Sequence, residues 1–315
     1  MHRTYTYYSK LKDTDKADKL KSVTLSNLID LEIILRHNID RSIHFYRLTS
    51  KLVPLATHKD VMFDYKDTFV MKFKHIGRIM KDNNLRVDTH PDQFNVINSD
   101  KEQVFINTRR NLLHHAELFN SFGYDLGKMI VHVGSGKNGK EQSIERFITN
   151  FKRLPLSVQS TLLIENDDKT YTAKETLSLC QKLNLPMVLD VHHHSCNNNG
   201  EVLSEFLREI FETWKNEYFP PKIHFSGGRK APLDRSHSDY INVDDFIAFI
   251  EIAKEINIDF DVMLETKMKD AALISLVNDL KSKSNYEWRD QSTLIVKKET
   301  FKSLRFFYFN SPRII

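Results

Sequence analysis

The sequence predicts an α/β protein of the (β/α)8 TIM-barrel class whose first strand is missing or replaced. Short apolar runs of β type recur roughly every 40 residues, and amphipathic helical patterns lie between them. Metal-binding residue types follow nearly every run. Strand–helix alternation implies parallel strands joined by helical crossovers. This period, repeated over so many units, suits a barrel better than an open sheet.

Seven β-type runs justify the strand count. They lie at residues 42–48, 85–90, 128–134, 161–166, 187–192, 222–226 and 261–265. Helical patterns occupy residues 20–38, 67–84, 102–123, 174–184, 204–218 and 243–257, and another runs from about 270 to 284. A complete barrel needs eight strands. Either residues 3–8 hide the first strand, or the chain begins after it.

The expected domain is a barrel over residues 1–284, followed by an extension over residues 285–315. The extension ends in a basic and aromatic stretch, "VKKETFKSLRFFYFNSPRII". Aromatic side chains usually bury area, so we expect it to pack on or near the barrel. Contact with nucleic acid is the alternative.

Composition excludes several classes of protein. The chain has 315 residues, 40% of them hydrophobic, and a net charge of +4, which permits a polyanionic partner without requiring one. Two cysteines cannot form a disulfide framework, so we expect a reducing cytoplasm. No apolar run approaches the roughly 20 residues of a membrane span. The start, "MHRTYTYYSK", has no apolar signal core.

Candidate metal ligands stand at or just after the ends of the runs, where the active sites of barrel enzymes lie. Imidazoles and carboxylates together bind zinc, manganese or iron. An acid inside an apolar strand is costly unless it is paired or bound to metal. The number of these residues predicts a site for two or three ions. They are His58, His90, His132, Glu165, Asp190, His193, His224, His237 and Glu265.

The stretch "LDVHHHSC" contains one acid and three consecutive histidines. Asp190 and His193 are three residues apart across a predicted strand-to-loop turn, so both can face adjacent metals. We expect His192 and His194 to be structural or to support the ligands. The remaining histidines are also expected to be structural, namely His2, His37, His44, His75, His114 and His115.

Two other features, a glycine-containing loop and the two cysteines, say less about function. The glycines of "HVGSGKNGK" do not have the spacing of a Walker phosphate loop, although this loop could touch a phosphodiester backbone. Cys180 has no CxxC partner, and nothing completes a cysteine-rich site around Cys196.

Seven segments together resemble the UV damage endonucleases. They are "FYRLTSKLVPLATH", "THPDQF", "IVHVG", "IENDDKTYT", "LDVHHH", "PPKIHFS" and "RSHSDY". The similarity runs from about Thr4 to Glu265, and "ENDDKT" followed by "DVHHH" is its most specific part. The strand-end ligands alone would place the chain, less specifically, in the barrel superfamily of endonuclease IV and xylose isomerase.

The resemblance implies a DNA repair enzyme that nicks duplex DNA immediately 5′ to pyrimidine dimers and related lesions. It implies two to three divalent ions, with Mn²⁺ favoured and Zn²⁺ or Mg²⁺ as alternatives. Glu165 would bridge two ions, and Lys222 matches a lysine that this family carboxylates. The resemblance implies catalytic roles for Glu165, Lys222 and His224. Gln93 and Phe94 match a pair that wedges into the duplex at the lesion.

The resemblance further implies damaged double-stranded DNA as partner, with no membrane and no obligatory protein partner. We expect a monomer. One departure is that the family's first strand, with its lesion-contacting Tyr and Asn, has no match here. Two alternatives therefore stay open, namely a sugar isomerase on the same barrel and a catalytically impaired lesion-binding protein.

Overall fold

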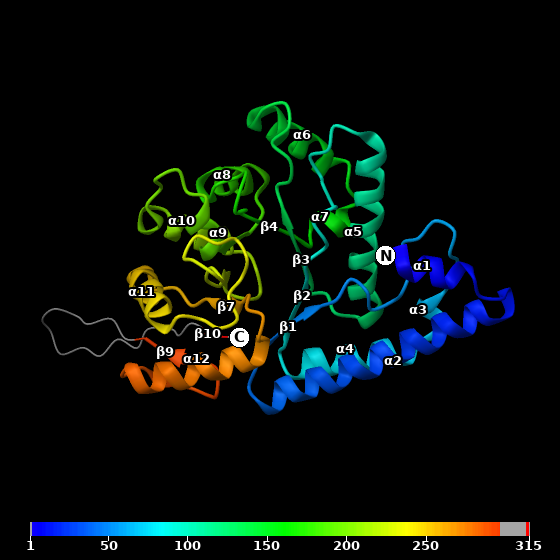
Figure 1. Cartoon of the computed structure of the whole chain (residues 1–315), viewed down its shortest axis with the longest axis horizontal. Coiled ribbons are helices and arrows are strands. Elements are labelled where there is room, and N and C mark those ends of the chain that lie inside the picture. The colour runs from blue at the N-terminus through cyan, green and yellow to red at the C-terminus, as the bar shows by residue number, and fades with distance from the viewer. Residues whose placement is uncertain (1, 297–312, 315) are drawn as a thin grey trace, which may run out of the picture. The chain divides into compact units, whose positions relative to one another are not determined.

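The computed structural model describes residues 2–296 and 313–314. The chain forms two compact units (Figure 1). The first comprises residues 1–40, 44–131 and 145–162, and the second comprises residues 41–43, 132–144 and 163–315. Each unit contains parallel strands with helices packed around them, and each is described by itself below.

The first unit contains three parallel strands, β1 (Phe45–Leu48), β2 (Arg86–Thr89) and β3 (Lys128–His132), whose last residue begins the second unit. β2 lies between the other two, with Val87 opposite Tyr46 and Thr89 opposite Met129. The helices of the N-terminal half are α1 (His2–Ser9), α2 (Asp13–Asp40), α3 (Tyr65–Thr68), α4 (Val70–Asp82) and α5 (Glu102–Phe122). Between β3 and β4 lie α6 (Lys140–Lys152) and α7 (Leu156–Gln159).

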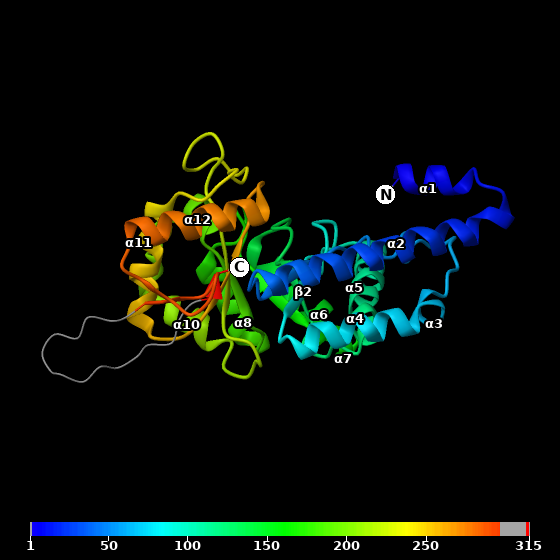
Figure 2. The ribbon, with the colours of Figure 1, turned by 90° about the horizontal axis from the view of Figure 1, so that it is seen from below.

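The long helix α2 runs beside α4, as Figures 1 and 2 both show. Leu28, Leu31 and Leu35 of α2 are buried at helical spacing. α4 packs closely on α5 because Gly77 has no side chain: a Cβ there would lie 1.7 Å from the carbonyl oxygen of Phe122. Gly123, at φ 62°, then ends α5 in the left-handed conformation.

The second unit contains β4 (Leu162–Glu165), β5 (Met187–Asp190), β6 (Lys222–Phe225) and β7 (Asp261–Leu264), which pair in that order and in parallel. Its α-helices are α8 (Ala173–Leu183), α9 (Val191–Cys196), α10 (Leu207–Glu212), α11 (Val243–Ala253) and α12 (Lys269–Lys283). Two 3₁₀ turns, η1 (Leu203–Glu205) and η2 (Lys254–Ile256), and a hairpin of β8 (Glu287–Trp288) and β9 (Leu294–Ile295) also belong to it.

Four of the strands are buried along their whole length, as expected where helices cover a parallel sheet. All four residues of β2, β4, β5 and β6 are buried. Any polar side chain in these strands therefore needs a compensating partner.

All seven predicted strands are present, but the prediction that residues 3–8 could hide a first strand is wrong, because they lie in α1. A further strand, β10 (Arg313–Ile314), pairs in parallel with the free edge of β7, with Arg313 opposite Asp261. In a closed barrel this edge pairs with the first strand. A short strand from the tail thus occupies the edge of β7 at which a first strand would pair. The remaining tail residues, 297–312 and 315, lie outside the described residues.

The helix predicted over residues 204–218 is shorter, since only η1 and α10 form within it. The chain leaves the helix at Thr213 because its hydroxyl accepts a hydrogen bond from the amide of Met187 (3.0 Å), while Trp214 donates to the carbonyl of that same residue (2.6 Å). Both bonds tie this segment to the start of β5. The boundary at residue 284 stays a prediction. Within the described residues, every helix is too short or too polar to cross a membrane.

Candidate metal centre

The second unit gathers acids and imidazoles at the carboxyl ends of its parallel strands. Glu165 ends β4, Asp190 ends β5, His224 is the third residue of β6, and Glu265 directly follows β7. Parallel strands bring these ends to the same edge of the sheet. The cluster therefore follows from topology and strand length.

His224 lies between two carboxylates. Its Nδ1 is 2.6 Å from Glu165 Oε1 and 3.1 Å from Glu265 Oε1. His224 and Glu165 are completely buried, at 0% and 1% exposure. Ligands that share one ion at about 2.1 Å lie roughly 3 Å apart. This spacing matches a common metal ion.

A second triad shares Glu165 with Asp190 and His193. The prediction of a strand-to-loop turn here is wrong, because the chain passes directly into helix α9. Asp190 caps that helix, and its Oδ1 accepts a hydrogen bond from the amide of His193 at 2.7 Å. Its Oδ2 lies 3.7 Å from His193 Nδ1 and accepts no hydrogen bond from the described residues. This buried oxygen is available to a cation.

Asn166 holds two members of this triad, Asp190 and His193. Its side chain accepts from the amide of Asp190 (2.9 Å) and donates to the Asp190 carbonyl (3.0 Å). Its own carbonyl lies 3.0 Å from His193 Nδ1. Since a carbonyl only accepts, Nδ1 carries the proton, and Nε2 keeps a lone pair for a metal.

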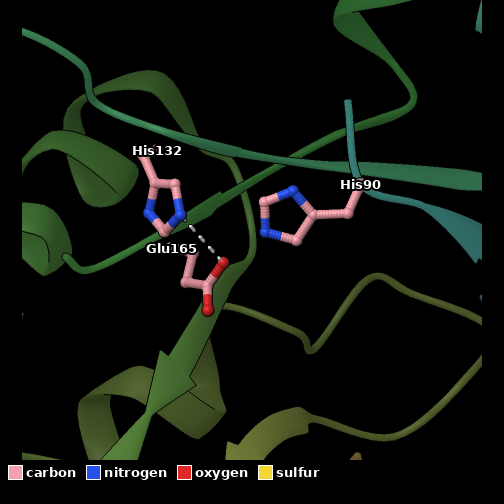
Figure 3. A group of neighbouring side chains, drawn as sticks. All are labelled: His90, His132 and Glu165. Carbon is pink, nitrogen blue, oxygen red and sulfur yellow. Dashed lines mark ion pairs between the residues drawn. The ribbon is translucent and has the colours of Figure 1, made fainter. Parts of the chain in front are cut away.

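Two further histidines of the second unit border the carboxylates. His132 Nε2 lies 3.7 Å from Glu165 Oε2 (Figure 3). His237 Nε2 lies 3.6 Å from Glu265 Oε2, and its Nδ1 forms a 2.7 Å hydrogen bond with the hydroxyl of Ser226. Of the predicted ligands, the structure thus brings together His132, Glu165, Asp190, His193, His224, His237 and Glu265.

The buried carboxylates of the strand-end cluster favour a positive charge among them, as the pKa values of Asp190 and His193 indicate. Burial raises the pKa of the Asp190 carboxyl to about 7, an effect that the charge of His193 opposes and the neighbouring acids increase. Burial lowers the pKa of His193, but Asp190 and Glu165 outweigh it and raise the value to about 9. A divalent ion would satisfy the same carboxylates more strongly than a proton shared with imidazole. The donor set, with hard oxygens and imidazole nitrogens and no thiolate, fits manganese or zinc.

Lys222 is completely buried two residues before His224 on β6. Alternate residues of a strand point to the same face, so Lys222 lies one layer below His224. A fully buried lysine is rare, and its ammonium needs compensation or chemical modification. Both the catalytic role of Lys222 and its carboxylation stay predictions.

Four predicted site residues belong to the first unit. His90 directly follows β2, and its Nδ1 lies 3.3 Å from the carbonyl oxygen of Pro91. Gln93 and Phe94 lie on a turn closed by Asp92, whose side chain accepts from the amide of Phe94 (3.0 Å). Phe94 is 75% exposed, and its role as a lesion contact stays a prediction. The placement of His90 at the metal centre stays a prediction.

His58 has other surroundings within the first unit. Its ring stacks on Tyr5 of α1, with centroids 3.8 Å apart, and its Nδ1 accepts a hydrogen bond from the amide of Asp60 (3.3 Å). It also lines a cavity of about 570 Å³ with Arg110, His114 and His115. Its assignment as a metal ligand stays a prediction.

Sequence reasoning missed the supporting residues. Asn166 and Ser226 position His193 and His237, respectively. Each follows a strand-end ligand by one or two residues, which is the available signal. His192, expected to be structural, is held by a hydrogen bond between its Nε2 and the carbonyl of Asp234 (2.9 Å).

Comparison with known families decides the identity. The sequence pattern of the family described as UV-endonuclease UvdE matches residues 2–294. The chain belongs to this family. It is 42% identical over 280 residues to a UV DNA damage endonuclease of Bacillus mycoides, covering 89% of this chain and 88% of the relative. A UV DNA damage endonuclease of Bacillus cereus is 41% identical over 292 residues, covering 92% of each chain.

Solved structures agree. The crystal structure of SacUVDE has a TM-score of 0.78 and 35% identity, over 87% of this chain and 91% of that one. Endonuclease IV from Thermus thermophilus has a TM-score of 0.55 at 14% identity, over 80% and 94%. At that identity endonuclease IV shows the fold alone, and the predicted barrel class is confirmed. The UvdE family is one of endonucleases, so the chain is an enzyme of that class.

Proposed function

We propose that this UvdE-family protein nicks duplex DNA immediately 5′ to UV photoproducts such as pyrimidine dimers and thereby starts excision repair. The observation that carries the proposal is the buried cluster around Glu165, in which His224 and two carboxylates lie at metal-ligand spacing. Such clusters serve the hydrolysis of phosphodiesters. Family membership supplies the substrate class.

The cluster would hold two to three divalent ions, with manganese favoured. Bound ions would supply hydroxide near neutral pH and stabilise negative charge on the scissile phosphate. Glu165 would be shared between ions, because its two oxygens face different neighbours: Oε1 faces His224 and Oε2 faces His132. We further propose that His90 and a carboxylated Lys222 complete the site.

The Gln93–Phe94 turn supports lesion recognition. Pro91 fixes one end of the loop, and Asn95 closes the other by donating to the Asp92 carbonyl (2.9 Å). An exposed ring on a stiff turn suits insertion where a lesion has already weakened base stacking. The amide of Gln93 would pair with exposed base edges.

The decisive experiment is nicking of irradiated against unirradiated plasmid with added Mn²⁺, followed by chelation. We expect nicks only in irradiated plasmid, and their loss on chelation. Binding of irradiated DNA without nicking, with metals shown to be present, would instead support an impaired lesion-binding protein. Family membership argues against the sugar isomerase. We also propose a cytoplasmic monomer, which size-exclusion chromatography would test for its oligomeric part.

A further inference from the structure

The loop between β6 and α11 contains a defined hairpin, residues 229–236, called the 229–236 hairpin below. The amide of Arg229 donates to the carbonyl of Ser236 (2.8 Å). The carboxylate of Asp234 accepts from the amides of Lys230 (3.1 Å) and Ser236 (2.9 Å). Gly228 is required at its base, since a Cβ there would lie 1.9 Å from the carbonyl of Ala231. The hairpin is therefore held in one conformation.

The hairpin is anchored next to the metal centre within the second unit. His192, adjacent to the candidate ligand His193, donates from Nε2 to the carbonyl of Asp234 (2.9 Å). The next residue after the hairpin is His237, whose Nε2 lies 3.6 Å from Glu265 Oε2. Arg235 pairs with Asp168 at 3.6 Å. Whatever binds the hairpin is thus held at a fixed place relative to Glu165 and its neighbours.

The tip of the hairpin is apolar, and its flanks are basic. Ala231, Pro232 and Leu233 are exposed, and Leu233 is 66% exposed. Arg229 and Lys230 precede this tip and Arg235 follows it. Lys230 forms no ion pair with any acid among the described residues, so its ammonium is available to a ligand.

This combination fits one kind of partner. Cations beside an exposed leucine match duplex DNA, where phosphates line the grooves and apolar side chains pack against sugars and base edges. An acidic protein would use the cations but has no regular recess for the leucine.

We propose that the 229–236 hairpin is a second DNA-contacting element, in which Lys230 binds a backbone phosphate and Leu233 packs into a groove beside the scissile bond. The inference rests on the proposed nicking of DNA and extends it. It gives the second unit a grip on the duplex in addition to the Gln93–Phe94 turn of the first unit.

The charge contact is tested by salt dependence. Each neutralised phosphate contributes a slope of about 0.9 to the plot of log affinity against log salt. Lys230→Ala should reduce the slope for binding of a duplex oligonucleotide by about 1. Lys215→Ala, which removes an exposed lysine between α10 and β6, is the control and should leave the slope unchanged.

The apolar contact is tested by Leu233→Ala. On the apolar area that a leucine would lose, DNA affinity should fall roughly tenfold. Metal content and melting temperature should stay those of the parent, because the side chain is exposed. Leu156→Ala, which truncates a leucine with 80% exposure on α7, is the matched control.

The two proposals fail in different ways. If the parent chain neither binds nor nicks irradiated duplex DNA with Mn²⁺ present, both are wrong. If the parent nicks irradiated DNA while Lys230→Ala keeps its salt slope and Leu233→Ala keeps its affinity, the hairpin inference alone is overturned. Loss of both properties in the hairpin variants, with the controls unchanged, supports it.

Discussion

The strand-end cluster of the second unit and the histidine pair on α5 of the first unit both bury imidazoles, yet the imidazole pKa values of His193 and of the α5 pair are shifted in opposite directions. The carboxylates around His193 outweigh burial and raise its pKa to about 9. Burial lowers the pKa of His114 to about 4 and that of His115 to about 3. Burial alone keeps an imidazole neutral, whereas neighbouring acids make the same residue part of a cation site.

The difference explains which of the 14 histidines matter for metal binding. His114 forms a 3.2 Å hydrogen bond through Nδ1 with the hydroxyl of Tyr65, and His115 lies beside it in the wall of a cavity. No carboxylate approaches either ring within ion-pair distance among the described residues. His114 and His115 therefore differ from His193, which also lies on a helix, mainly in the acids that topology brings near the ring.

Substitution of Glu165, the acid at the centre of the strand-end cluster, should have the largest effect on activity. Loss of a residue that merely supports a metal ligand costs about 10–100-fold, so Glu165→Gln, which alters a shared ligand, should reduce nicking by at least about 100-fold. Metal content measured by elemental analysis should fall as well. Glu209→Gln on α10 is a surface control. Full nicking with parental metal content in Glu165→Gln would refute the site.

Substitution of Phe94, the proposed wedge residue, should affect DNA binding without affecting metal binding. Phe94→Ala removes an exposed ring whose stacking is worth about 1–3 kcal/mol, so binding and nicking of irradiated DNA should weaken by roughly one to two orders of magnitude. Metal content should not change, because Phe94 is not one of the proposed ligands and its side chain is exposed. Parental nicking, or loss of metal, would show that the ring has another role.

The buried histidines of α5, His114 and His115, should make the free energy of unfolding depend on pH. Burial lowers the pKa of His115 from 6.5 to about 3. Between these two pH values the imidazole is protonated in the unfolded chain and neutral in the folded chain. The free energy of unfolding should therefore fall as pH drops from 6.5 to 4.5, by up to about 2 kcal/mol from this residue. His115→Leu should lose less stability over this range in urea titrations and should nick normally. His37→Leu is the control, and an unaltered pH dependence in His115→Leu would contradict the assignment.

A partly buried acid of the first unit, Glu32, should give the smallest effect. Glu32 of α2 contacts Lys72 (2.6 Å), Arg36 (2.7 Å) and His75 (3.1 Å). The hydrogen bond from Lys72 is the largest contribution that lowers the Glu32 pKa to about 2. This stabilisation is present above pH 4.5 and is lost as pH falls toward 2.

The expected loss of stability is small because the Glu32 and Lys72 side chains are both partly exposed to solvent. Glu32→Gln should cost about 1 kcal/mol at pH 7, and salt should weaken the effect. Asp30→Asn on the exposed face of the same helix should cost less. Equal melting temperatures of Glu32→Gln and the parent at low salt would show that the network contributes nothing.

Local pattern was enough to predict the strands and to select most of the side chains that the structure brings together as candidate ligands. Apolar runs predicted all seven strands, and polar residues at their ends predicted Glu165, Asp190, His224 and Glu265, because parallel strands leave little choice of where their carboxyl ends lie. Asp190 illustrates the limit. Its side chain caps α9, and nothing in "DVHHH" distinguishes a six-residue helix from a loop.

Long-range pairing was not accessible from pattern. β10 is two residues long and pairs with β7, which precedes it by about 50 residues, so no local periodicity marks it. The hairpin after β6 depends on Asp234 accepting from two backbone amides, a contact that composition alone does not specify. Asn166 lies in the motif "IENDDKTYT". Its hydrogen bonds to the backbone of Asp190 become evident only when β4 and β5 lie side by side.

Gly77 has a practical consequence for work in living cells. Any larger residue there meets the backbone of α5 and not a movable side chain, so Gly77→Ala must push two helices apart. The damage would be confined to packing within the first unit and would leave every ligand in the second unit chemically intact. This glycine is therefore a position to choose for a temperature-sensitive allele, because weakened packing in the first unit would be lost on warming first.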